Sequence, residues 1–222
     1  MLSEYLEKTR YCDCQNPEIK AKARELEGKD ETKTAVNVWK FISYVPYRFD
    51  FWNVKASETL DKRYGMCTNK ANLQIAILRA AGIPAAYGTM KIRKSALLDV
   101  SSPDFYEKIS PVTTHIFAYV YLNGEWIATD ATRDRTLEGD VPHDPLDNRA
   151  YPWDGKTNYK KSPNFVISEG KMSANIDKKL EIKPRFITPE VLERINTHID
   201  NMQERRSHES KHNEKESAHH CG

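Results

Sequence analysis

One dipeptide constrains the fold of this 222-residue chain more than any other feature: Asn123-Gly124. It lies between two short segments rich in β-branched and aromatic residues, HIFAYVYL (115–122) and EWIATD (125–130). Asn-Gly is the preferred pair for a two-residue type I′ turn, because both central residues of that turn need a positive φ. The sequence therefore predicts an antiparallel hairpin in which the turn itself fixes how the two strands pair.

The register of this hairpin brings two polar side chains together. With a two-residue turn Leu122 pairs with Glu125, and counting back along both strands pairs Phe117 with Asp130. Side chains alternate between the faces of a strand, so His115, Phe117 and Asp130 share one face. His115 and Asp130 become diagonal neighbours with Cα atoms roughly 7–8 Å apart, a gap that a carboxylate–imidazole hydrogen bond can bridge. A slip of one residue would send them to opposite faces.

The second candidate catalytic feature is a cysteine at the predicted start of a helix. Residues 68–81 (TNKANLQIAILRAA) are apolar around most of the helix circumference and end before Gly82, which predicts a buried central helix. Cys67 directly precedes this helix and follows Gly65-Met66, where the small glycine allows a tight turn. A helix N-terminus supplies partial positive charge that favours a thiolate, and free N–H groups that can bind an oxyanion.

Cysteine, histidine and aspartate are the residue types that nucleophilic acyl transfer requires. The thiolate attacks, the imidazole carries the proton, and the carboxylate orients the imidazole. We therefore expect Cys67, His115 and Asp130 to form a catalytic triad. Each residue also has a structural alternative: a buried free cysteine, a half-buried histidine with a hydrogen-bond partner, and an aspartate bonded to nearby backbone. The helix-start setting and the shared strand face favour the catalytic interpretation.

Two segments carry a specific pair of motifs: GMCTNKANLQIAILRAAGIPAAYG (65–88) and THIFAYVYLNGEWIATDAT (114–132). The first holds Gly-x-Cys and then Leu-Arg-Ala-Ala-Gly-Ile-Pro; the second holds a His that opens a strand, Gly-x-Trp and Asp-x-Thr. In this order they resemble the transglutaminase-like superfamily. The resemblance implies an α+β, papain-like core, with the catalytic Cys at the N-terminus of a central helix packed on an antiparallel β-sheet that carries the His and the Asp. It also implies acyl transfer through a thioester.

The remaining segments are assigned from periodicity and punctuation. We expect helices at 17–27, 31–45 and 189–205, the last with Thr188 as its N-cap, and strands at 85–92 and near 165–168 and 180–186. We expect loops at 46–64, 93–112 and 134–165. We expect a single domain over 1–206, with a core over about 30–132 and a C-terminal elaboration over 133–206. The tail, 207–222, has almost nothing apolar to bury and is expected to be disordered.

Charge and apolar content argue against several classes of function. The chain has 34 basic and 32 acidic residues and a net charge of +2, without a basic stripe interleaved with aromatics, so nothing supports nucleic-acid binding. No apolar run reaches membrane-spanning length, and the N-terminal segment MLSEYLEKTRYCDC lacks the apolar core of a signal peptide. We therefore expect a cytoplasmic protein with reduced thiols.

Cys12 and Cys14, together with the histidines and Cys221 of the tail, contain atoms that could bind zinc. Their spacing fits no structural zinc pattern, and a solvated tail is the favoured alternative. We expect no metal and no cofactor.

The expected reaction is hydrolysis of a peptide or isopeptide amide bond, because water is always available as the acyl acceptor. Two alternatives stay open: transfer to an amine, as in a transamidase or amide synthase, and a non-catalytic binding module on the same fold. The Cys67 N–H would donate to the oxyanion, and Tyr47 and Asn53 are candidates for a second donor or substrate contact. The aromatic side chains of segment 44–52 could line the cleft or pack as a satellite of the core. The expected partner is a peptide or protein amide, with no nucleic acid and no membrane.

Overall fold

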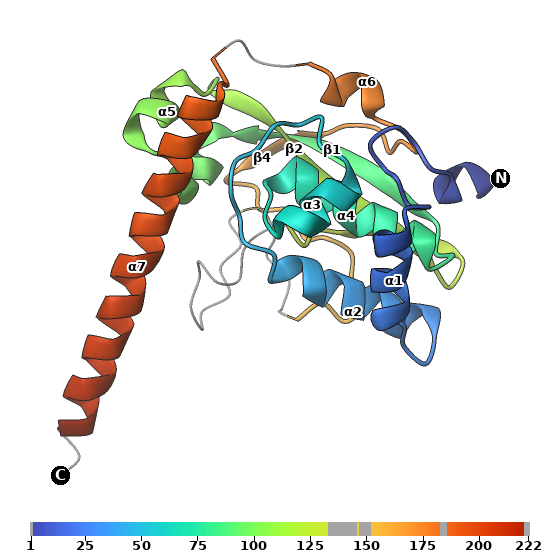
Figure 1. Ribbon diagram of the computed structural model, residues 1–222, viewed down its shortest axis with the longest axis horizontal. Coiled ribbons are helices and arrows are strands. Elements are labelled where there is room, and N and C mark those ends of the chain that lie inside the picture. The colour runs from blue at the N-terminus through green and yellow to red at the C-terminus, as the bar shows by residue number, and fades with distance from the viewer. Residues whose placement is uncertain (1, 133–145, 147–151, 183–185, 220–222) are drawn as a thin grey trace.

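The chain folds around a four-stranded antiparallel sheet whose main helices cover one face (Figure 1). The computed structural model describes residues 2–132, 146, 152–182 and 186–219, with residues 205–219 described by their backbone alone. The strands are β1 (Ala85–Arg93), β2 (Val112–Leu122), β3 (Glu125–Thr129) and β4 (Val166–Glu169), arranged in the order β3-β2-β1-β4. This mixture of helices and antiparallel sheet confirms the expected α+β fold.

The hairpin of β2 and β3 has the predicted turn and the predicted register. Asn123 has a φ of 53° and Gly124 a φ of 91°, the positive values that a type I′ turn requires. Leu122 pairs with Glu125, and the ladder continues in step to the far end of β3. Because the turn fixes this register, the inward and outward faces of β2 follow directly from the sequence.

The predicted central helix is α4 (Cys67–Ala80), and every residue from Thr68 to Arg79 is buried. On one side it packs against β1 and β2. On its other sides it packs against three shorter helices, α1 (Pro17–Glu25), α2 (Glu31–Ser43) and α3 (Ala56–Lys62). A helix that is covered all around buries side chains on every face. Its buried polar residues Lys70, Asn72 and Arg79 donate hydrogen bonds to backbone carbonyls of neighbouring segments.

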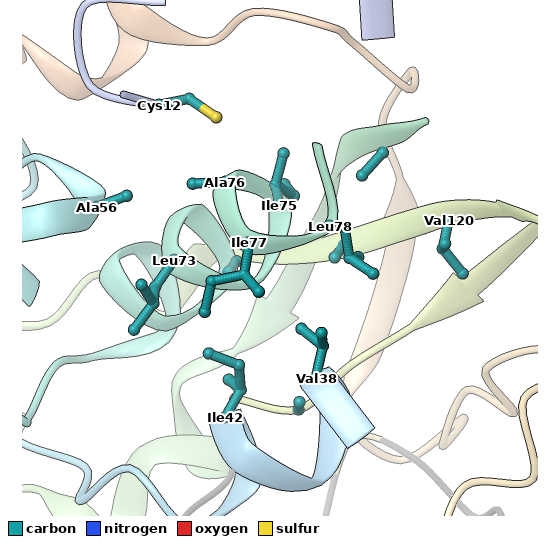
Figure 2. Packing of buried hydrophobic residues seen from close by; sticks show 14 of the residues in the cluster. Cys12, Val38, Ile42, Ala56, Leu73, Ile75, Ala76, Ile77, Leu78 and Val120 are labelled. Atoms are coloured by element: carbon teal, nitrogen blue, oxygen red, sulfur yellow. The ribbon is translucent and has the colours of Figure 1, made fainter. Parts of the chain in front are cut away.

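The main hydrophobic core surrounds α4 (Figure 2). Val38 and Ile42 of α2 approach the helix from one side, and Cys12 approaches it from the opposite side. Val120 of β2 belongs to the same cluster and lies near Leu78. Each fully buried aliphatic side chain of this kind contributes about 1.5–3 kcal/mol, so this core holds the middle and end of α4 in place.

Two segments expected to be loops contain helices. Within 46–64 the chain forms α3, where Glu58 accepts a hydrogen bond from the Lys55 N–H, and Ser57 is bonded to Asp13. Within 93–112 it forms the 3₁₀ helix η2 (Lys94–Val100) and α5 (Pro103–Lys108). These helices are too short to show an apolar period, and their stability comes from tertiary contacts that local sequence does not encode.

The C-terminal region departs further from expectation. Strand β4 confirms the strand predicted near 165–168, but the strand predicted at 180–186 is wrong: residues Asp177–Leu180 form the short helix α6, and 183–185 lie outside the described residues. The Asn175 side chain accepts from the Asp177 N–H at 2.7 Å, a local hydrogen bond at the first residue of α6. Of the segment expected to be irregular, 134–165, the described residues 146 and 152–165 form neither a helix nor a strand, as predicted, and the rest lies outside the described residues.

The last helix, α7 (Pro189–His219), begins where predicted and ends later. Thr188 caps it by accepting from the Val191 N–H at 3.4 Å. The helical backbone continues beyond Arg205, through the segment that we expected to be disordered (Figure 1). That segment has no Gly or Pro before Gly222 and contains several Glu and Lys, so nothing in it terminates a helix. That residues 1–206 form one domain, and that the tail adds nothing to its stability, stay predictions. Among the helices described, none is both long and apolar enough to cross a membrane.

Candidate active site

Cys67 is the first residue of α4 and stands at a tight entry turn. Gly65 pairs with Tyr47 in a parallel bridge, and its N–H donates to the Pro46 carbonyl at 3.1 Å. A Cβ at Gly65 would lie 2.7 Å from the Cβ of Asn69, so a larger residue would push the turn away from the helix. Cys67 is only partly buried, whereas the residues on either side of it are buried. Cys67 is therefore the one residue of this first turn that is partly open to solvent, at a helix N-terminus that favours the thiolate.

His115 and Asp130 are joined across the hairpin as the register predicted. The Nε2 atom of His115 lies 2.5 Å from Oδ2 of Asp130, and both side chains are almost completely buried. Because Nε2 is engaged with Asp130, Nδ1 is the ring nitrogen left to face the Cys67 thiol, whose pKa His115 lowers. The structure thus places His115 and Asp130 in contact, and His115 lies near enough to Cys67 to lower the pKa of its thiol. That the three residues form a catalytic triad stays a prediction.

Asp130 is held by groups that local sequence reasoning did not identify. Its Oδ1 accepts from the Thr132 N–H at 2.9 Å and from the Thr132 hydroxyl at 2.7 Å. Its backbone carbonyl accepts from the indole N–H of Trp39 in α2 at 2.7 Å. The Asp-x-Thr sequence could have suggested the first interaction, since an aspartate side chain commonly accepts from the backbone N–H two residues on. Trp39 is far away in sequence, and no local signal marks it.

The imidazole of His115 rests on an aromatic stack. Its ring is parallel to that of Phe117, with centroids 6.4 Å apart and an interplanar angle of 10°. Phe117 in turn stacks on Tyr159, with centroids 5.6 Å apart. Gly88 of β1 makes room for this stack, because a Cβ there would lie 2.4 Å from the Phe117 ring. The stack covers one face of the imidazole, while the ring edge that carries Nε2 points to Asp130.

The pKa of the Cys67 thiol is lowered from its usual value. Burial is the largest influence and acts to raise this pKa, because it penalises the charged thiolate. The hydrogen bond and the positive charge of His115 act in the other direction and, together with hydrogen bonds from the Ile116 N–H and the Thr68 hydroxyl, prevail. A lowered thiol pKa is the property that a nucleophilic cysteine needs.

His115 and Asp130 shift in the complementary directions. Burial acts to lower the pKa of His115, but the charge and hydrogen bond of Asp130 raise it well above the usual value. Burial acts to raise the pKa of Asp130, but His115 and then Thr132 bring it below the usual value. All three pKa shifts are thus in the direction that stabilises the charged form: thiolate, imidazolium and carboxylate.

The two residues proposed for substrate or oxyanion contact lie in the loop before α3. Tyr47 is buried, pairs through its backbone with Gly65, and packs edge-on against Phe49 with ring centroids 5.6 Å apart. Asn53 is partly exposed near the start of α3. The loop belongs to a second apolar cluster against which Cys67 also packs. A donor role for Tyr47 or Asn53 stays a hypothesis.

Metal binding can be assessed only for the described part of the chain. There, no group of three or more His, Cys, Asp or Glu side chains is arranged to hold an ion. Cys12 and Cys14 are both buried and free. Cys221 and the side chains of the tail histidines lie outside the described residues, so the absence of a metal stays a prediction.

Residues 20–131 match the family model described as "Transglutaminase-like superfamily". No curated protein matches the sequence. Among solved structures, the chain is similar to a protein described as a "putative cysteine protease" from Cytophaga hutchinsonii, with 27% sequence identity and a TM-score of 0.46. The matched region covers 60% of this chain and 42% of that protein, so the chain corresponds to less than half of that relative.

Proposed function

The chain belongs to the transglutaminase-like superfamily, and we propose that it is a cysteine-dependent enzyme that cleaves an amide bond through a thioester on Cys67. Family membership supports the general class, a cysteine peptidase or acyltransferase. The observation that supports the specific proposal is the buried pair of His115 and Asp130, 2.5 Å apart, beside the Cys67 thiol whose pKa His115 lowers. The substrate is a peptide or protein amide, and hydrolysis is the favoured reaction.

The first half of the reaction forms the acyl-enzyme. The Cys67 thiolate attacks the amide carbonyl carbon, a C–S bond forms, and the carbonyl electron pair moves onto oxygen. The Cys67 N–H, free at the helix N-terminus, donates to this oxyanion. The oxyanion then re-forms the carbonyl, the C–N bond breaks, and the His115 imidazolium gives its Nδ1 proton to the departing amine. The products are a thioester and a neutral imidazole, which Asp130 keeps oriented.

The second half releases the acyl group. Neutral His115 removes a proton from water as the water oxygen attacks the thioester carbon. The C–S bond breaks, the carboxylic acid leaves, and the thiolate–imidazolium pair is restored. An amine could replace water in this step, which would make the protein a transamidase or amide synthase. A binding module would not need the opposed pKa shifts of Cys67 and His115, and these shifts favour an enzyme.

The proposal is tested by comparing the wild type with Cys67→Ala. We expect the wild type to be labelled at Cys67 by iodoacetamide and to release product from a library of peptide, glutamine and asparagine amides. Cys67→Ala is expected to be folded, unlabelled at this position and inactive. Adding an amine such as hydroxylamine separates hydrolysis from transfer, because only a transferase would favour the hydroxamate product over the acid in dilute amine. Product release by a folded Cys67→Ala protein would refute the proposed nucleophile.

A further inference from the structure

Helix α7 is hydrogen-bonded to the backbone of the loop beside the proposed nucleophile. We call residues 46–52 the aromatic loop. The side chain of Asn196 in α7 makes two hydrogen bonds to one residue of this loop: its Oδ1 accepts from the Phe49 N–H at 2.8 Å, and its Nδ2 donates to the Phe49 carbonyl at 2.9 Å. An asparagine that satisfies both backbone groups of one residue fixes that residue as a neighbouring strand would.

The charged groups of the aromatic loop are engaged away from the nucleophile. Arg48 forms an ion pair with Asp200 of α7 and donates to Gln203 at 2.5 Å. Asp50 is buried, pairs with Lys62 of α3 at 2.7 Å, and accepts from the Phe51 N–H at 2.7 Å. Because Arg48 and Asp50 are paired with residues of other elements, the side chains that the loop contributes to the neighbouring apolar cluster are its aromatic rings.

The aromatic loop lies against the first turn of α4. The Arg48 N–H donates to the Gly65 carbonyl at 3.3 Å. Further along, the Phe51 carbonyl accepts from Nδ2 of Asn69 at 2.9 Å, and Oδ1 of that asparagine accepts from the Met66 N–H at 3.2 Å. Phe51 is therefore held within one helical turn of Cys67.

An apolar cluster fills the space between this loop, α7 and the helix start. Phe51, Trp52 and Cys67 are each partly buried and all pack against it. Phe49 meets Phe105 of α5 edge-on within this cluster, with ring centroids 4.9 Å apart. The buried members are Tyr47, Phe49, Met66, Val100, Phe105, Ile109, Leu192, Ile195 and Ile199. The surroundings of the proposed nucleophile on this side are thus aromatic and aliphatic.

We propose that the aromatic loop forms a subsite for an aromatic or large aliphatic acyl group, and that Asn196 is the positioning residue that holds this subsite beside Cys67. The inference rests on the proposed function and adds its substrate class. It also assigns a role to α7, which lies outside residues 20–131 matched by the family model. Asn196 touches neither the reacting atoms nor the acyl group; it acts through Phe49.

Loss of the two hydrogen bonds between Asn196 and Phe49 should reduce turnover of some substrates more than others. Without Asn196, Phe49 loses the partners of its N–H and its carbonyl, and the loop is free to shift relative to Cys67. A shift of about 1 Å in a positioning element is enough to reduce turnover by up to about 100-fold. The shift should reduce turnover only for substrates whose acyl group is large enough to reach the subsite. The thiolate and its partners His115 and Asp130 remain in place.

The test uses two p-nitrophenyl esters with the same leaving group, one carrying a 3-phenylpropanoyl group and one an acetyl group. For the wild type we expect kcat/KM to be at least about 10-fold higher for the phenylpropanoyl ester. In Asn196→Ala we expect this ratio to fall by about 10-fold, with the acetyl ester and iodoacetamide labelling of Cys67 within about twofold of wild type. Thr197→Ala is the matched control, because it makes a similar gain in helix propensity at an exposed neighbouring position. It should keep the wild-type ratio.

Asn196→Asp is the second variant in case Asn196→Ala does not fold. It has nearly the same shape and can still accept from the Phe49 N–H, but it cannot donate to the Phe49 carbonyl, so the ratio should again fall. An unchanged ratio in folded variants would overturn the inference, and so would a parallel loss of labelling, which would place the effect on the nucleophile. Equal rates for both esters in the wild type would also overturn it. Failure of the proposed function looks different: neither ester would be hydrolysed in a manner that depends on Cys67.

Discussion

The Nε2 atom of His115 and the Oδ2 atom of Asp130 lie 2.5 Å apart, although 15 residues separate them in the chain. The contact exists because the hairpin register puts both side chains on one face as diagonal neighbours. That register follows from the two-residue turn at Asn123-Gly124. The position of the proposed base thus depends on a turn at the far end of the hairpin.

Replacing Gly124 with Val tests this dependence. Gly124 has a φ of 91°, which a β-branched residue adopts only with strain, although a Cβ there would meet nothing within 4 Å. We expect Gly124→Val to lose at least about 1 kcal/mol of unfolding free energy and most of its activity, because a slipped register separates His115 from Asp130. Urea unfolding and ester hydrolysis measure the two effects.

Asn123→Gly is the control for that experiment, since glycine at the first turn position keeps the type I′ geometry. It should retain both the activity and the rate of Cys67 labelling. Wild-type turnover in a folded Gly124→Val protein would show that the turn does not set the register.

The parts of the fold that sequence predicted are those with strong local signals. Asn123-Gly124 specified a turn through its backbone conformation, and Cys67 was marked by its place before a long apolar helix. From these two features the arrangement of the candidate triad could be anticipated, because period-two alternation converts a register into a shared face.

The parts that sequence missed depend on contacts between distant segments. Helix α3 is seven residues long, and its Ser57 is fixed by Asp13, which lies 44 residues away. The hydrogen bond from Trp39 to the Asp130 carbonyl joins residues 91 positions apart, and the hydrogen bonds between Asn196 and Phe49 join residues 147 positions apart. No local pattern distinguishes these side chains from other tryptophans and asparagines, so only the folded chain identifies them.

The aromatic stack under His115 leads to a prediction at Gly88. A Cβ at Gly88 would fall 2.4 Å from the Phe117 ring, so Gly88→Ala must displace Phe117 and with it the surface on which His115 rests. We expect a loss of about 1–3 kcal/mol in unfolding free energy, typical of overpacking in a core, and a clear fall in kcat. Thermal unfolding and ester hydrolysis are the measurements.

A compensating substitution separates packing from the stack. In Gly88→Ala combined with Phe117→Leu, the smaller side chain should relieve the clash and restore much of the stability. Because leucine has no ring to stack on His115, kcat should remain low. Full recovery of kcat in the double variant would mean that the stack has no part in positioning the histidine.

The C-terminal end of α7 provides a prediction about stability. Residues 207–222 contain almost no apolar side chains, so whatever helix they form rests on its own backbone hydrogen bonds. Ending the chain at Arg206 should leave the melting temperature within about 1 °C and the ester hydrolysis unchanged. A decrease of several degrees, or one that appears only when zinc is present with the full chain, would show that the tail docks on the domain or binds metal.

Asp130→Asn tests the electrostatics of the site. Asp130 holds the pKa of His115 well above its usual value, and the imidazolium in turn holds the pKa of Cys67 below its usual value. The amide removes the charge that opposes burial, so the pKa of His115 should fall and Cys67 should lose its cationic neighbour. We expect the midpoint of the pH dependence of iodoacetamide labelling to rise by about 1 pH unit or more, and turnover at pH 7 to fall by about 10²-fold or more.

The same substitution has a predictable effect on stability. The raised pKa of His115 contributes stability that is complete below its unfolded value of about 6.5 and is lost as pH rises through the folded value. The lowered pKa of Asp130 contributes stability that is present above its unfolded value of about 3.9 and is lost as pH falls through the folded value. The difference in unfolding free energy between wild type and Asp130→Asn should therefore be largest between about pH 4 and 6.5 and should shrink on both sides. Urea unfolding across this range measures it, and a difference that does not vary with pH would mean that Asp130 supports the fold through its hydrogen bonds to Thr132 and not through its charge on His115.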